Sequence, residues 1–286
     1  MNACIYWDLI VHEILVSTHD CHNIMCKLNC WYFSAQDPWP NDVKLFQPTE
    51  EQMLLPDNAN CLAVQAFLKM CGLDFEVERR SNAAYMSPSG HVPFIKSSVF
   101  MVAELDPIVS FVNTKGVSLS RSLDSSQNAD MRDFITLVNT VLANAELYVT
   151  WCDRAILHDV TKPRFGSTLP WPLNHILTWQ RRAEVMEKLS AQGWGSKTLD
   201  EVCQEVGQLC TALAERLENR PYFFGDRPTE LDALLFGHLF AILTVPVVEN
   251  KIAAIVREHR GLVELVKRID STFFGRSTDV SQLYSP

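Results

Sequence analysis

The stretch HVPFIKSSVFMV, residues 91–102, predicts two short strands joined by a tight turn. Its apolar runs, Val92–Ile95 and Val99–Val102, have the length of short strands, and the segment between them is polar. The segments on either side of this pair complete a small α/β unit.

On the N-terminal side, Val43–Phe46 and Asp74–Glu78 alternate as strands do. Between them, the residues that follow Asp57 have apolar side chains at helical spacing up to Gly72, which suits the end of a helix. On the C-terminal side, Glu104–Thr114 has helical spacing. The resulting order, β-α-β-β-β-α, predicts a thioredoxin-like half domain.

The rest of the chain shows helical spacing only. We predict a long amphipathic helix over Ala129–Cys152, a Pro-rich loop over Pro163–Pro172, a helix opened by the capping box Thr198–Glu201, and a last helix over Ile252–Val266. We therefore expect three parts: residues 1–36, an extension without sustained periodicity and poorly ordered; residues 37–117, the α/β domain; and residues 118–286, an all-helical domain.

Composition narrows the functional classes. The chain has 286 residues, a net charge of −9 and no segment of clustered Lys and Arg, so we predict no nucleic-acid partner. Its nine cysteines are odd in number and irregularly spaced, which favours a reducing compartment over a disulfide framework. The most apolar run, Ala233–Val248, contains Pro246 and predicts a buried core helix; no run is long enough to predict a membrane span.

Two motifs add a family resemblance to this pattern. Ser87–Ile95, SPSGHVPFI, resembles the turn into the third strand of glutathione transferases, which implies a cis peptide bond before Pro93. Tyr222–Asp232, YFFGDRPTELD, resembles the motif that organises their helical domain. In it Thr229 caps a core helix, and Asp232 reaches back to the Thr229 amide.

Longer strings resemble the metaxin family, and its second branch in particular. They are DNANCLAVQAF (residues 57–67), AYMSPSG (84–90), PWPLNHIL (170–177) and PTELDAL (228–234), and the likeness extends from about Asp37 to about Phe274. The resemblance implies a non-enzymatic subunit of the sorting and assembly machinery on the cytosolic face of the mitochondrial outer membrane, where proteins are imported and β-barrels inserted. It also implies peripheral attachment, with a membrane-anchored first metaxin and the β-barrel assembly channel as partners.

The alternative is a divergent glutathione-dependent transferase or thiol reductase. A glutathione site needs a reactive hydroxyl or thiol after the first strand, the cis-Pro backbone, and an acid-Ser pair that holds the γ-glutamyl carboxylate at a helix N-terminus. Here Leu105 stands where the Ser belongs, and Asp106 adds a negative charge. Cys61 lies near a predicted helix N-terminus and is a core thiol or a reactive one. We predict no catalytic residue and no cofactor.

Two further groups of residues leave alternatives open. The ligand types for a zinc site occur together at His19, Cys21, His22, Cys26 and Cys30, but their spacing is not that of a zinc site, so we predict no metal. Three tryptophans, Trp171, Trp179 and Trp194, crowd the Pro-rich loop and the helix after it. They are either anchors of a protein interface or internal packing between the domains.

Overall fold

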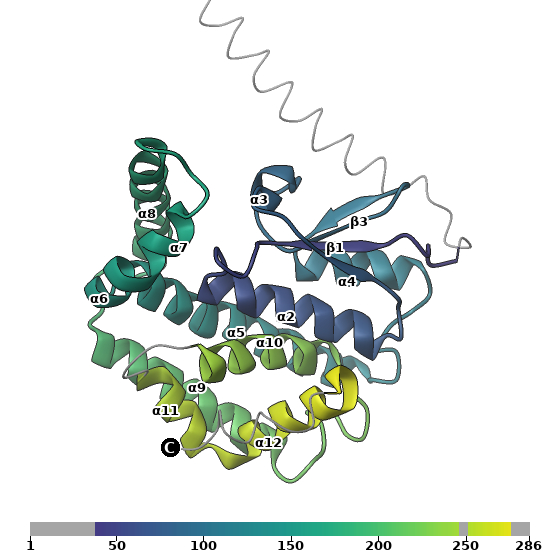
Figure 1. The fold of residues 1–286 in the computed structure, drawn as a ribbon. Helices are drawn as coiled ribbons and strands as arrows, with labels where there is room; N and C mark the ends of the chain where they lie inside the picture. Colours follow the sequence, from purple (N-terminus) through teal and green to yellow (C-terminus); the bar gives the residue numbers. More distant parts are fainter. Residues whose placement is uncertain (1–37, 246–250, 276–286) are drawn as a thin grey trace, which may run out of the picture.

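The computed structural model describes residues 38–245 and 251–275 (Figure 1). Its sheet consists of β1 (Lys44–Gln47), β2 (Glu76–Arg79), β3 (Phe94–Lys96) and β4 (Met101–Ala103), in the order β2-β1-β3-β4. Strands β1 and β2 are parallel, and the pairs β1–β3 and β3–β4 are antiparallel. The predicted thioredoxin-like half domain is confirmed; the extension of residues 1–36 lies outside the described residues.

Helices cover both faces of this sheet. On one face, α2 (Leu55–Met70) and α4 (Leu105–Thr114) pack against Leu45 and Ile95 (Figure 1). On the other face, the short α3 (Ala83–Met86) lies over Phe46 and Phe94, whose rings stack 4.8 Å apart. Leu45 and Phe46 are neighbours in β1, and Phe94 and Ile95 are neighbours in β3. Because side chains alternate along a strand, the members of each pair lie on opposite faces of the sheet.

The second part of the chain is all-helical, as predicted. Its elements are α5 (Ser125–Trp151), α6 (Arg154–Ile156), the π-helical turn η1 (Leu157–Thr161), α7 (Lys162–Gly166), α8 (Leu173–Ala191), α9 (Leu199–Leu217), α10 (Glu230–Thr244), α11 (Lys251–Glu258), α12 (Arg260–Ile269) and the π-helical turn η2 (Asp270–Phe274). Helix α10 lies between α2 and the outer helices, and every residue from Glu230 to Leu243 is buried (Figure 1). The apolar run predicted as a core helix is a buried helix as far as Thr244, and its last three residues lie outside the described residues.

The contact between α2 and α10 joins the two parts of the chain. Gly237 of α10 faces Ala59 and Ala63 of α2, and a side chain at Gly237 would stand 2.5 Å from the Ala63 nitrogen. Small residues on both helices allow this close approach, as ridge-and-groove packing requires. A single hydrophobic core then runs from Leu45 of the sheet to Val266 of α12.

Several predicted boundaries differ from the structure. Helix α2 begins at Leu55, so that Asp57 lies inside its first turn, where an acid favours the helix dipole, and not before it. Much of the predicted Pro-rich loop is helical, because Pro163 occupies an early helical position of α7, where its missing N–H costs nothing. The predicted last helix is two helices, since the backbone of His259 leaves the helical region between α11 and α12.

The start of α10 is organised around a buried carboxylate. Asp232 accepts hydrogen bonds from the backbone N–H of Thr229 at 2.8 Å, from the Thr229 hydroxyl at 2.8 Å and from the backbone N–H of Phe223 at 3.1 Å. Its side chain is fully buried, and burial raises its pKa to about 6. Asp232 thus joins the 222–225 turn to the helix and does more than close a local cap.

Candidate functional site

A cleft of about 360 Å³ lies where the sheet domain meets α5 and α8. Its sheet side includes the turn that ends in Pro93 and the start of α4 at Leu105. Its helical side includes Asn139 and Glu146 of α5 and Lys188 of α8. This is the place where the resemblance to glutathione transferases puts a ligand, so its chemistry decides between the two functional hypotheses.

The peptide bond between Val92 and Pro93 is cis. The carbonyl oxygen of Pro93 accepts a hydrogen bond from the Glu104 N–H at 3.0 Å, which ties the turn to the start of α4. Glu104 has a positive φ of 69°, an unfavourable conformation for a residue with a side chain. The backbone frame of the cleft is therefore held in place at some conformational cost, as is common at ligand sites.

The side chains on this frame do not suit an anionic ligand. Leu105, the first residue of α4, offers no hydroxyl, and Glu104 forms no side-chain cap. Asp106 follows in the first turn, and its pKa is raised by desolvation and then by the neighbouring Glu104 carboxylate. A helix N-terminus normally attracts anions, but two acids here oppose the binding of a carboxylate.

Asp57 and His91 line the cleft beside the Pro93 turn, and Arg181 of α8 lines it from the helical side. Desolvation raises the pKa of Asp57 to about 6, although the charge of Arg181 acts in the opposite direction. Desolvation also lowers the pKa of His91, and Arg181 adds to this shift. Burial is thus the main influence on the acid as well as on the histidine.

Asp57 should make the stability of the chain depend on pH. The folded state holds its proton more tightly than the unfolded chain, with a pKa of about 6 against 3.8. The stabilisation is therefore complete below pH 3.8 and is lost as the pH rises through 6. Between about pH 5 and pH 7.5 we expect the wild type to lose about 1 kcal/mol of unfolding free energy that Asp57→Asn does not lose. Urea midpoints measured at both pH values test this; parallel losses in the two proteins would contradict it.

The five cysteines within the described residues do not suit the part of a glutathione-site nucleophile. Cys61 is buried in α2, and desolvation followed by the charge of Asp57 raises its pKa well above the ordinary value. Cys71 and Cys210 have pKa values raised to about 12, and those of Cys152 and Cys203 are also raised, in each case mainly by desolvation. Of the two interpretations of Cys61, the structure favours the core thiol, because a protonated buried thiol is a poor nucleophile.

Other buried polar groups are paired within the helical domain. His238 of α10 and Glu146 of α5 meet through Nδ1 and Oε1 at 2.8 Å, and both side chains are almost fully buried. Burial raises the pKa of Glu146, while His238 opposes this shift. His238 falls within the predicted core helix, but the sequence does not indicate its partner, because no local pattern marks a contact between α5 and α10.

No group of three or more metal-ligating side chains occurs in residues 38–245 and 251–275. The cysteines and histidines between His19 and Cys30 lie outside the described residues. The predicted lack of a metal therefore stays a prediction.

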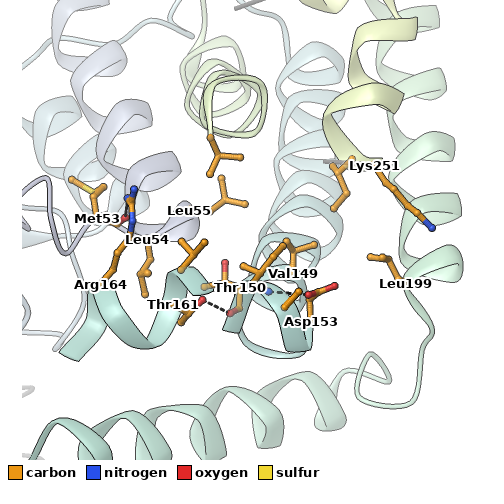
Figure 2. Close-up of a pocket in the computed structure, with 15 residues that line it drawn as sticks. Met53, Leu54, Leu55, Val149, Thr150, Asp153, Thr161, Arg164, Leu199 and Lys251 are labelled. Carbon is orange, nitrogen blue, oxygen red and sulfur yellow. Dashed lines mark hydrogen bonds between the residues drawn. The ribbon is translucent and has the colours of Figure 1, made fainter. Parts of the chain in front are cut away.

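A smaller cavity of about 210 Å³ lies between the start of α2, the end of α5 and α11 (Figure 2). Apolar side chains such as Leu54 and Val149 line most of it. Its polar members bond to the chain itself: the Thr161 hydroxyl donates to the Thr150 carbonyl oxygen at 2.6 Å, and Arg164 donates to the Met53 carbonyl oxygen at 2.9 Å. These bonds join η1 to α5 and α7 to the segment just before α2, so the polar groups have a structural role.

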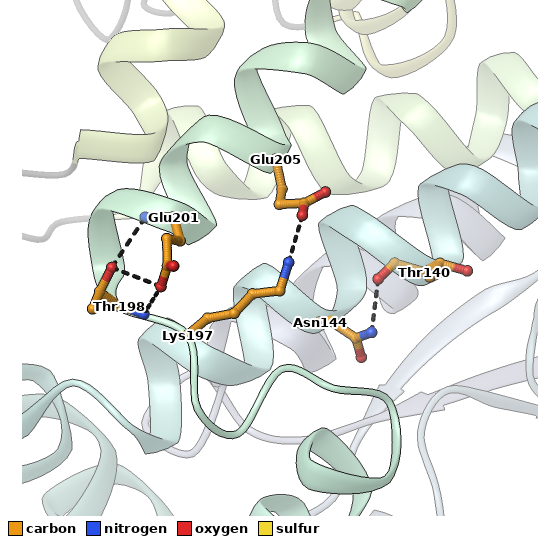
Figure 3. A network of polar contacts seen from close by, with 6 residues as sticks. All are labelled: Thr140, Asn144, Lys197, Thr198, Glu201 and Glu205. Carbon is orange, nitrogen blue, oxygen red and sulfur yellow. Dashed lines mark hydrogen bonds and ion pairs between the residues drawn. The ribbon is translucent and has the colours of Figure 1, made fainter.

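A polar network at the start of α9 is likewise structural (Figure 3). The predicted capping box is present: the Glu201 N–H donates to the Thr198 hydroxyl at 3.3 Å, and the Thr198 N–H donates to the Glu201 carboxylate at 2.6 Å. Lys197, just before the helix, forms an ion pair with Glu205 of α9. The bonds of Thr198 and Glu201 satisfy N–H groups that a helix start leaves without partners.

The three tryptophans separate into two environments. Trp171 is 80% exposed and Trp179 is 73% exposed, whereas Trp194 is 4% exposed. The chain reverses at Gly193, so that the Trp194 ring turns back into the core with the Lys197 ammonium 4.8 Å from its centre. Of the two interpretations left open for the tryptophans, Trp194 fits internal packing, and Trp171 and Trp179 are the two with free surface.

Comparisons with known proteins agree with this architecture. Residues 61–182 match the Tom37 family, described as outer mitochondrial membrane transport complex protein, and residues 206–269 match the glutathione S-transferase C-terminal domain. Among solved structures, a glutathione transferase from Populus trichocarpa aligns with a TM-score of 0.51 at 15% identity, covering 85% of this chain and all of that one. A β-etherase from a Sphingobium species aligns with a TM-score of 0.52 at 19% identity, covering 85% and 98%. These structures establish the glutathione-transferase-like fold and nothing of the chemistry.

Several proteins found by sequence comparison are much more similar to the chain in sequence than these structures are. Metaxin-2 of Mus musculus and metaxin-2 of Homo sapiens are each 50% identical to the chain over 242 residues, covering 84% of it and 92% of the relative. The metaxin-2 homolog of Caenorhabditis elegans is 42% identical over 213 residues, covering 74% and 92%. Metaxin-1 of Mus musculus is more distant, at 28% identity over 225 residues. The chain therefore belongs to the metaxin family, as a homologue of metaxin-2 within the Tom37 group of outer mitochondrial membrane transport proteins.

Proposed function

We propose that the chain is a non-enzymatic subunit of the sorting and assembly machinery on the cytosolic face of the mitochondrial outer membrane. In this role it is held peripherally by a membrane-anchored first metaxin and works beside the β-barrel assembly channel in protein import and β-barrel insertion. The metaxin-2 relatives over most of the chain support the family role. No described helix combines the length and apolar character needed to cross a bilayer.

The observation that carries the non-enzymatic part is the chemistry of the cleft. It keeps the cis-Pro93 turn but has Leu105 in place of a hydroxyl donor, with Asp106 beside it. A missing hydrogen bond to a charged group costs about 1.5–3 kcal/mol, or roughly a ten- to hundredfold loss of affinity. Negative charge at the same point weakens the binding of an anion further.

The runner-up, a divergent glutathione-dependent transferase or thiol reductase, rests on the retained cis-Pro93 turn. Calorimetric titration of the purified chain with glutathione distinguishes the two. We expect no micromolar affinity in the wild type and roughly a tenfold or larger gain in Leu105→Ser, since the new hydroxyl restores one charge-assisted hydrogen bond. Micromolar binding by the wild type, with turnover lost in Cys61→Ser, would overturn the adaptor role.

The assembly itself is tested by affinity purification of the tagged full chain from detergent-solubilised mitochondria. An anchored metaxin and the β-barrel channel should be recovered with it. Depletion of the anchored metaxin should lower the mitochondrial amount of the chain, and external protease should digest it on intact organelles. Recovery of neither partner, or digestion only after the outer membrane is opened, contradicts the proposal.

A further inference from the structure

The end of the molecule formed by α7, the α7–α8 loop and the first half of α8 has an unusual composition. We call residues 160–183 the α7–α8 tip. It carries Lys162, Arg164, Arg181 and Arg182 and no Asp or Glu, in a chain whose net charge is −9. The tip is thus a local positive region of an acidic protein.

Large apolar side chains on this tip face the solvent. Besides Trp171 and Trp179, Leu173 and Ile176 are about half exposed. The side of α8 that packs inward is marked instead by Thr178, Val185 and Leu189. In Figure 1, α7 and α8 project from the helical domain beside the sheet, at the end of the molecule where α3 also lies. Scattered exposed apolar residues are ordinary, but two tryptophans and two aliphatic residues within nine positions form a patch.

Another exposed aromatic residue lies across from the tip. Tyr85 of α3 is 73% exposed, and it lines a cleft of about 500 Å³ together with Leu177 and Gln180 of α8. The segment 79–91 that contains Tyr85 also has no acid, while it has Arg79 and Arg80. The cleft is lined by Arg80 on the side of Tyr85 and by Arg181 on the side of α8, together with the acids Asp57 and Glu184.

Two arginines of the tip are held by main-chain carbonyl oxygens. Arg182 donates to the Trp151 carbonyl oxygen at 3.2 Å, and Arg164 donates to a main-chain carbonyl in the same way. Hydrogen bonds to neutral carbonyl oxygens position these groups and leave their charge in place. Within the tip, Arg181 is paired with an acid, Glu184, which lies just beyond it; across the cleft, Arg79 and Arg80 are paired with Glu50 and Glu78.

We propose that the α7–α8 tip is a lipid-binding surface that sets the rings of Trp171 and Trp179 into the headgroup region of an anionic bilayer. Trp and Tyr favour this region because their rings are apolar and their edges polar. Basic residues beside them are attracted by anionic headgroups, and the lack of acids removes the opposing repulsion. A protein partner could also cover the patch, but it would not require an acid-free sequence. The inference rests on the proposed function only in naming the outer membrane as the bilayer concerned.

Sedimentation of the purified full chain with vesicles tests the surface. Vesicles of phosphatidylcholine with phosphatidylglycerol should bind the chain, and pure phosphatidylcholine should bind it less. Trp171→Ala combined with Trp179→Ala should weaken binding at least about tenfold, or about 1.4 kcal/mol. Leu137→Ala removes a 45% exposed apolar side chain from α5, outside the tip, and should change nothing.

A charge variant separates the electrostatic part. His175→Glu places an acid in the first turn of α8, where the helix dipole favours it, so folding should be preserved. It should weaken binding to the anionic vesicles more than to pure phosphatidylcholine, and added salt should reduce that difference. His158→Glu, at another exposed histidine outside the tip, is the matched control and should bind as the wild type does.

Equal vesicle binding by the wild type and the double tryptophan variant, or no binding by either, would overturn the proposal. Unchanged vesicle binding together with loss of the anchored metaxin in a detergent pull-down would show instead that the tip is a protein interface. The proposed function is measured separately, in detergent extracts without a bilayer, so either idea can fail without the other.

Discussion

Gly237→Ala should strongly destabilise the chain, because it adds a methyl group where α10 meets α2. The added carbon would lie 2.5 Å from the backbone nitrogen of Ala63 and 2.7 Å from its Cβ, and it would also collide with the Ala59 carbonyl oxygen. Two of these atoms belong to the backbone of α2 and the Ala63 Cβ is bonded directly to it, so they cannot move aside as a flexible side chain would. Overpacking a core costs about 1–3 kcal/mol, and a contact between two helix backbones should reach about 3 kcal/mol or exceed it.

The measurement is the urea midpoint of the purified variant, with helicity followed by circular dichroism. Gly207→Ala is the matched control, because it is also a glycine inside a helix, and its added carbon would meet only Ile255 at an ordinary 3.7 Å. That control should be neutral or stabilise by up to about 1 kcal/mol, since Ala is the better helix former. Equal midpoints for Gly237→Ala and the wild type would show that α2 and α10 do not pack as described.

Asp232→Ala should have the second largest effect, a loss of about 3 kcal/mol or more of unfolding free energy. The carboxylate is fully buried and accepts from the N–H groups of Phe223 and Thr229. Its removal leaves two buried donors without partners, and each such group costs about 1–3 kcal/mol. Both the 222–225 turn and the start of α10 lose their connection, so the helical domain should unfold at lower urea.

Two variants calibrate this result. Asp232→Asn keeps one accepting oxygen and should lose less than Asp232→Ala. Glu201→Ala breaks the exposed capping box of α9, where water can replace the carboxylate, and should cost only about 1 kcal/mol. A loss of the same size in Asp232→Ala and Glu201→Ala would mean that Asp232 is an ordinary helix cap.

The elements that could be predicted are those that depend on nearby residues. The alternation in Val43–Phe46 and the short apolar run Val92–Ile95 predicted strands within one or two residues of β1 and β3. Thr198 and Glu201 form their capping box as the spacing requires, since both partners lie within one helical turn. Helix ends were less certain: α11 and α12 share one apolar periodicity, and nothing in it marks the break at His259.

The sequence shows which residue types occupy the candidate site, but it does not show their contacts. Leu105 and Asp106 already argue against glutathione from the sequence, because residue type alone decides whether a hydroxyl is present. The raised pKa of Asp57 could not be foreseen, since it depends on burial at a cleft whose two rims are far apart in the chain. The contact between Glu146 and His238 could not be foreseen either, because α5 and α10 are far apart in the chain.

Local spacing and residue type were enough for the order of elements, the thioredoxin-like half domain, the helical second part and the family resemblance, because period and cap chemistry act over a few residues. Tertiary packing alone decided which tryptophans face solvent. Trp171, Trp179 and Trp194 are alike in the sequence, but the reversal at Gly193 turns Trp194 into the core while α8 carries the other two outward. A side chain's burial depends on what the rest of the chain brings against it, and that is a property of the whole fold.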